Sequence, residues 1–83
     1  MSRSNVRKKI NLTFPQHLIK EPVVYNVGRK FNVVTNIRTA SVTDEIGIMA
    51  LEITGEEEEY QKAVEYLREI GVRVDPIEMD IVE

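Results

Sequence analysis

The sequence predicts an α+β fold of the ferredoxin-like type, a βαββαβ split sandwich in which an antiparallel four-stranded sheet carries two helices on one face. Three observations predict it: alternating apolar residues mark a strand at each end, two segments have helical spacing of apolar residues, and a β-branched hairpin separates those segments. Because crossover connections are right-handed, this order places the first and third strands in the centre of the sheet and the second and fourth at its edges.

Size and composition limit what the chain can be. Its 83 residues suffice for one modest core, so we expect a single domain over residues 6–83 and a flexible arm over residues 1–5. The balance of 11 basic and 14 acidic residues, net −3, argues against nucleic acid as a partner. Without cysteine the chain has no thiolate for a zinc or iron-sulfur site, and we expect no cofactor. No apolar run is long enough to span a membrane, so we expect no membrane insertion and a cytoplasmic location.

The first strand is predicted from Val6 to Phe14, where even positions are mostly apolar and odd positions polar. This period of two is typical of a strand with one buried face. Pro15 ends it because proline cannot donate to a sheet.

The first helix is predicted to start at Pro22, since the first helical turn leaves its N–H groups unpaired in any case. Its apolar residues recur at helical spacing: Val23, Val24, Val27 and Phe31. Gly28 weakens this helix by ~0.5–1 kcal/mol relative to alanine. Gly28 either allows close packing against the sheet or leaves room for a ligand or partner.

A hairpin is predicted from two β-branched segments, residues 33–42 and 46–54, joined by a turn at residues 43–45. The first segment contains no acidic residue, and Arg38 is its only charge. Exposed strand edges are usually covered, so we expect this edge strand to pair with a second copy in a homodimer.

The second helix is predicted after Thr54, which forms a possible capping box with Glu57. The acidic run from Glu56 to Glu59 suits the positive end of a helix, or it serves an interaction. One apolar stripe is expected to face the core: Tyr60, Ala63, Val64 and Leu67. Gly71 should end this helix.

The last strand alternates through Val72 and Val74 and again through Ile77, Met79 and Ile81, but the parity flips at Asp75-Pro76. A bulge or bend there would reconcile both halves. Proline also indicates an edge position.

No set of residues suggests catalysis, and we do not expect an enzyme. His17 has neither a second histidine nor a cysteine as a partner, and it is expected in a solvated loop. Solvation and edge protection explain the carboxylate pairs, which are Asp44 with Glu45 and Asp75 with Glu78 and Asp80. A basic cluster near the amino terminus is either a solvated surface or a docking patch for an acidic partner or lipid headgroups: Arg3, Arg7, Lys8 and Lys9.

Asn36 stands out because asparagine is a poor strand former within a β-branched segment. Its amide offers a carbonyl acceptor and two N–H donors, which suit the ammonium and carboxylate of an amino acid. The alternative is that Asn36 hydrogen-bonds a neighbouring loop or helix end.

Several short motifs together resemble the NIL domain, a sensor module of methionine-importer ATPase subunits that also occurs alone or beside ferredoxin modules. The motifs are Phe14-Pro15, Glu21-Pro22, Phe31-Asn32-Val33, Thr35-Asn36-Ile37 and Gly47-Ile48-Met49. The resemblance implies a regulatory module that binds methionine between two copies.

The family's Asn-Ile-Leu signature matches at Asn36 and Ile37, with Arg38 in place of leucine. The resemblance implies that Asn36 lines the pocket. Arg38 lies two residues further on, so we expect it on the same face, where it could pair with a ligand carboxylate or reject an apolar tail. Val27 and Met49 are candidates for an apolar wall, or simply core residues.

We therefore expect a binding domain for L-methionine or a related sulfur amino acid that regulates an ABC transporter. The alternative is a ligand-free protein-interaction module that serves ferredoxin-type or sulfur-transfer machinery in homocysteine or methionine synthesis.

Overall fold

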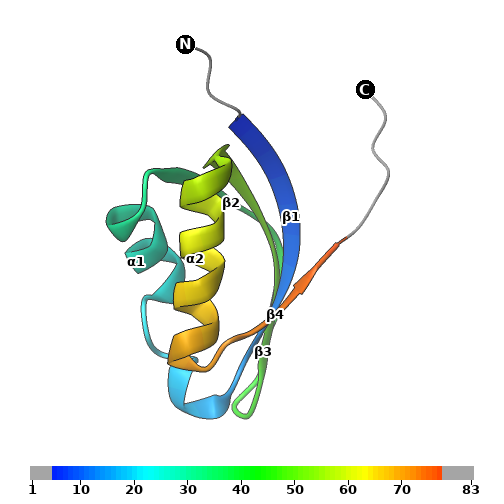
Figure 1. Ribbon diagram of the computed structural model, residues 1–83. Helices are drawn as coiled ribbons and strands as arrows, with labels where there is room; N and C mark the ends of the chain where they lie inside the picture. The colour runs from blue at the N-terminus through cyan, green and yellow to red at the C-terminus, as the bar shows by residue number, and fades with distance from the viewer. Residues whose placement is uncertain (1–4, 78–83) are drawn as a thin grey trace.

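A computed structural model of the chain describes residues 5–77 and shows one sheet with two helices on one of its faces (Figure 1). The elements are β1 (Asn5–Phe14), a short 3-10 helix (Gln16–Leu18), α1 (Val23–Lys30), β2 (Val33–Val42), β3 (Gly47–Glu56), α2 (Glu57–Ile70) and β4 (Arg73–Pro76). The strand order is β2-β3-β1-β4, and every neighbouring pair is antiparallel. The ferredoxin-like α+β fold is confirmed, and so are the central and edge positions expected from the sequence.

The core lies between the helices and one face of the sheet. Alternate residues of β1 and β3 point into it, and the strand residues without exposed surface are Ile10, Leu12, Leu51 and Ile53. The predicted stripe of α2 covers them, and Leu67 has no exposed surface. The period-two pattern therefore identified the buried face of β1 correctly.

The start of α2 differs from the prediction. Thr54 belongs to β3, which continues to Glu56, and α2 begins at Glu57 without a side-chain cap. The predicted capping box of Thr54 with Glu57 is therefore wrong, because Thr54 pairs with both Arg7 and Val34 in the sheet. The acidic residues do occupy the first turn of α2.

The far end of α2 matches the prediction. Gly71 adopts φ 108°, a left-handed conformation that glycine reaches without steric cost, and its N–H donates to the last carbonyls of the helix.

Two contacts connect α2 to the segment between α1 and β2. The backbone N–H of Asn32 donates to Glu59 Oε1 at 2.8 Å. This bond lowers the pKa of Glu59, because it favours the charged carboxylate. The rings of Phe31 and Tyr66 lie 5.6 Å apart, centroid to centroid. Both contacts fix the point where β2 enters the sheet.

Gly28 in α1 and Gly55 in β3 have opposite surroundings. Gly28 is exposed, and a Cβ there would meet no heavy atom within 4 Å, so the predicted close packing against the sheet is wrong. At Gly55 a Cβ would lie 2.9 Å from Val33 Cγ1 and 3.0 Å from the Asn32 carbonyl oxygen. Gly55 therefore allows the two strands to approach closely.

The last strand ends within the predicted range. β4 is an edge strand that pairs with β1, and its described part ends at Pro76. The second half of the alternating pattern, Met79 and Ile81, lies outside the described residues. The bulge expected at Asp75-Pro76 is not tested by the four residues of β4.

Leu67→Ala should lower the free energy of unfolding by ~2–5 kcal/mol, the usual cost of truncating a buried leucine, whereas Glu58→Ala should change it by less than about 0.5 kcal/mol. Urea unfolding at one fixed protein concentration measures both. Equal losses would show that α2 buries a different face.

Gly28→Ala should stabilise the protein by ~0.5–1 kcal/mol, because alanine favours an exposed helix position without a clash. Gly55→Ala should destabilise it by ~1–3 kcal/mol, because its Cβ meets backbone. Thermal melts of the two variants test the contrast. A stable Gly55→Ala variant would contradict the close approach of β2 to β3.

Candidate functional site

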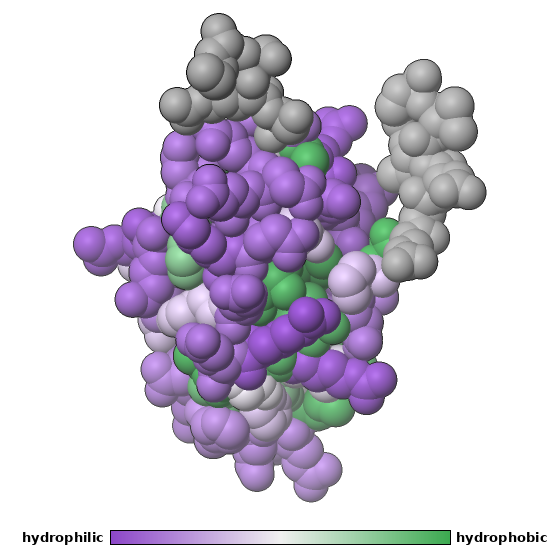
Figure 2. Space-filling view, in the orientation of Figure 1, coloured by the Kyte–Doolittle hydropathy of each residue, from purple (hydrophilic) through white to green (hydrophobic). Residues whose placement is uncertain are grey.

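The free edge of β2 is the most unusual surface of the described chain. The large apolar side chains that are most exposed all belong to α1 and the β2–β3 hairpin: Tyr25, Val34, Ile37, Val42, Ile46 and Ile48. On β2 itself, Val34, Ile37 and Val42 are 69%, 51% and 60% exposed. Figure 2 shows one side of the molecule, where hydrophilic residues cover most of the surface and hydrophobic areas are small.

The short length of α1 explains why this edge stays open. Its eight residues span about 12 Å, while the ten residues of β2 span roughly 33 Å. Helix α1 therefore covers only part of β2, and the half that contains Ile37 and Val42 keeps an exposed apolar face.

A groove of about 200 Å³ lies between α1 and the hairpin. Its apolar walls include Val24 and Tyr25 from α1, Ile37 and Val42 from β2, and Met49 from β3. Glu21 is the only charged residue among the described residues that line it. The groove can accept a small apolar group and offers one carboxylate for a cation.

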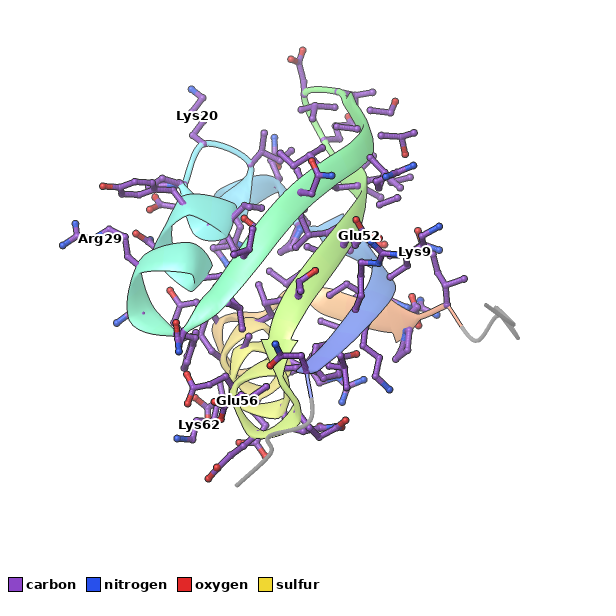
Figure 3. All side chains as sticks on the ribbon, turned by 90° about the horizontal axis from the view of Figure 1, so that it is seen from above. Lys9, Lys20, Arg29, Glu52, Glu56 and Lys62 are labelled. Carbon is purple, nitrogen blue, oxygen red and sulfur yellow. The ribbon has the colours of Figure 1, made fainter. Side chains whose placement is uncertain are left out.

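The other face of the sheet has no described helix over it (Figure 1). Its side chains are mostly polar or charged, with Val34 and Ile48 as exposed apolar residues. Near its centre the carboxylate of Glu52 lies 3.6 Å from Arg7 Nε and 3.9 Å from Arg38 Nη1. Lys9 and Asn36 are the direct cross-strand neighbours of Glu52. Figure 3 shows Lys9 and Glu52 side by side, away from both helices.

The sequence analysis missed Glu52. A signal was present, since Glu52 is a charged residue between Leu51 and Ile53, both of which have no exposed surface. This alternation alone places its side chain on the open face.

A β-bulge interrupts β2 at Arg38. The register with β3 shifts between Ile37 and Thr39, so Arg38 is an extra residue on the edge strand. Arg38 still reaches Glu52, and Asn36 pairs with Glu52 in the register, so both side chains lie on the open face.

The five candidate residues from the sequence therefore divide into three groups. Ile37 and Met49 line the groove. Asn36 and Arg38 lie on the opposite face of the same strand. Val27 is a residue of α1 that is completely buried in the core, and it presents no surface to a ligand in the single chain.

The remaining candidates do not line the groove. His17 is exposed in the 3-10 helix, at a more polar hollow that also contains Lys20 and Asp44. Of the described members of the basic cluster, Arg7 and Lys9 lie on the open face. Lys8 instead lies over the ring of Tyr60, 5.7 Å from its centroid.

The carboxylate pairs show no shared site. Asp75 pairs with Arg73 at 3.0 Å. The other members of that set, Glu78 and Asp80, lie outside the described residues, as does Arg3 of the basic cluster. Within residues 5–77 no three side chains of histidine, aspartate or glutamate are grouped as metal ligands.

The two helices described are too short or too polar to cross a membrane.

A comparison with known protein families identifies the family of this chain. The NIL domain profile matches residues 8–76, which include both helices, the hairpin and the groove. The chain belongs to the NIL domain family.

Its relatives are longer proteins. The methionine import ATP-binding protein MetN 1 of Listeria monocytogenes is 33% identical over 76 residues, which is 87% of this chain and 22% of that protein. The methionine import ATP-binding protein MetN of Vibrio vulnificus is 31% identical over 70 residues, 80% of this chain and 20% of that protein. The chain thus spans about a fifth of these relatives.

A solved structure has the same fold. The C-terminal domain of an ABC transporter ATP-binding protein from Enterococcus faecalis superposes with a TM-score of 0.73. The match covers 84% of this NIL domain and 82% of that chain, at 23% sequence identity.

Proposed function

We propose that this NIL domain is a regulatory module that binds L-methionine or a related sulfur amino acid and thereby controls an amino-acid importer from the cytoplasm. The observation that carries the proposal is the groove beside the free edge of β2, in a domain homologous to part of methionine import ATP-binding proteins. Its volume of about 200 Å³ is below the roughly 300–1,000 Å³ of pockets for drug-sized ligands, which suits one amino acid.

The walls of the groove match a thioether side chain. Met49 brings a polarizable sulfur, and Ile37 and Val42 bring branched aliphatic groups. These side chains are partly or largely exposed in the single chain, so a ligand would remove apolar surface from water.

The charged end of the ligand would bind at the edge of β2. A free strand edge presents unpaired N–H and C=O groups, which can bind a carboxylate and an ammonium. Asn36 lies on the far face of the strand, so a ligand contacts both Asn36 and the groove only by crossing this edge. Glu21, on the groove side, is a second partner for the ammonium.

A second copy of the domain would enclose such a ligand. The edge of β2 exposes Val34, Ile37 and Val42, and its one charged side chain, Arg38, is turned toward Glu52. The bulge at Arg38 limits regular pairing to one side of it, because a bulge disrupts the ladder locally.

L-methionine at ~100-fold excess over its Kd should stabilise the folded domain by about 2.7 kcal/mol, a rise in melting temperature of roughly 10 °C or more. Asn36→Ala should weaken binding about tenfold or more, since a ligand charge would lose its partner. Met49→Ala should also weaken it. Asn11→Ala is the matched control, because Asn11 is an exposed asparagine of β1 far from the β2 edge.

Two outcomes would count against this assignment. If Asn36→Ala unfolds the domain, the asparagine is a structural residue. If millimolar methionine, homocysteine and S-adenosylmethionine all leave the melting temperature unchanged, the domain has no such ligand, and a protein-interaction module for ferredoxin-type or sulfur-transfer machinery becomes the better assignment.

The domain should form a homodimer at tens of micromolar, and Ile37→Lys should yield monomers, because pairing would bury an unpaired charge on the edge strand. Gln61→Lys changes the charge equally at an exposed position of α2 and should leave the dimer intact. Light scattering measures the mass of each. A monomeric wild-type protein would exclude this dimer.

A further inference from the structure

The open face of the sheet carries positive charge although the whole chain is acidic. Among the described residues, the side chains on this face include four cations, Arg7, Lys9, Arg38 and Arg73, and two carboxylates, Glu52 and Asp75. With Glu56, the last residue of β3, which by the register falls on the same face, the net charge is +1, whereas the chain has −3. Five acidic residues lie instead on α2, behind the sheet: Glu57, Glu58, Glu59, Glu65 and Glu69.

The positive charge is concentrated at one end of this face. Asp75 is matched by Arg73 at 3.0 Å. At the other end a single carboxylate, Glu52, faces Arg7, Arg38 and its cross-strand neighbour Lys9. The Glu52 side chain is only 12% exposed, while Arg7 and Arg38 are 66% and 52% exposed. The guanidinium groups therefore remain available to solvent above a carboxylate that holds them in place.

We infer that the open face is a docking surface for an acidic protein surface, centred on Arg7, Lys9 and Arg38. Small and short polar residues surround the three cations: Asn11, Thr13, Ala50 and Thr54. Val34 and Ile48 are exposed apolar side chains on the same face, opposite Thr54 and Thr13. The exposed guanidinium groups between them can still be reached by the carboxylates of a folded partner, which they bind with two hydrogen bonds. Charge complementarity of this kind steers association.

The composition of the face favours a protein over other polyanions. The aromatic residues of the described chain belong to the core and the helix side, so this face has none on which bases could stack. Glu52 in its centre would also repel a continuous row of phosphates. Contact between this face and the acidic α2 of another copy would be head-to-tail, so it would form a ring or an open filament and not the two-fold dimer proposed above.

The surface is separate from the ligand groove, which lies on the other side of the sheet. Binding of a partner can therefore be tested without the ligand. Arg7 and Lys9 are suitable positions, because neither belongs to the residues proposed to contact methionine.

A short peptide of alternating glutamate and serine serves as the probe, and the same peptide with glutamine in place of glutamate is its control. At about 0.01 M ionic strength, where the screening length is roughly 30 Å, the acidic peptide should shift the amide NMR signals of residues around Glu52 and not those of α1. Arg7→Gln with Lys9→Gln should weaken binding roughly fivefold, and Glu52→Gln should strengthen it. The matched control is Arg29→Gln with Lys30→Gln, which removes the same charge from α1 and should have no effect.

The inference is overturned if the control pair weakens binding as much as the Arg7 and Lys9 pair, or if Glu52→Gln weakens it. It is also overturned if duplex DNA or anionic phospholipid vesicles bind this face more tightly than the peptide. If the amide NMR signals of this face and of α2 shift when only the protein concentration is raised, the surface binds a second copy of the domain. Because the Arg7 and Lys9 pair should keep the methionine-induced rise in melting temperature, failure of docking and failure of ligand binding can be told apart.

Discussion

The packing of both helices on a single face of the sheet determines the rest of this structure. In β1 and β3, Ile10, Leu12, Leu51 and Ile53 are fully buried against the helices, with Leu67 above them. Because side chains alternate along a strand, the residues between them must point to the other face. With no described helix on that side, those residues are polar or charged, and Glu52 and its basic neighbours follow from this arrangement. A one-sided core thus produces both the stability of the domain and a surface free for recognition.

The same packing leaves the edge strand incompletely covered. A helix rises 1.5 Å per residue and a strand more than twice as much, so the short α1 cannot cover all of β2. The uncovered half of β2 keeps Ile37 and Val42 exposed, and the groove forms where α1 and the strand diverge. The apolar edge is therefore a consequence of helix length. An uncovered apolar edge promotes aggregation, and a ligand or a second copy would cover it. For this reason the ligand groove and the dimer are proposed together.

The sequence predicted the parts of the fold that depend on periodicity. Alternation in β1 and the helical stripe of α2 identified the buried residues correctly, because burial on one face imposes those periods. The boundary at Thr54 could not be predicted locally, since the extension of β3 beyond it depends on pairing with β2 as far as Gly55 and with β1 as far as Glu56. The bulge at Arg38 has no glycine to indicate it. The period of two predicted correctly that Asn36 and Arg38 share a face of β2. It could not predict which face holds the groove, because that depends on where α1 packs.

The position of Arg38 bears on how ligand specificity and partner choice can vary in this family. From the sequence, Arg38 in place of leucine was expected to face the pocket, where it would pair with a ligand carboxylate or reject an apolar tail. In the structure the Arg38 guanidinium is directed to Glu52 on the open face, while the groove lies on the opposite side of β2. The exchange therefore leaves the apolar walls at Ile37 and Met49 unchanged and adds a cation to the surface proposed for docking. Ile37 and Arg38 are adjacent in the chain, yet a substitution at Ile37 changes the groove and one at Arg38 changes the open face.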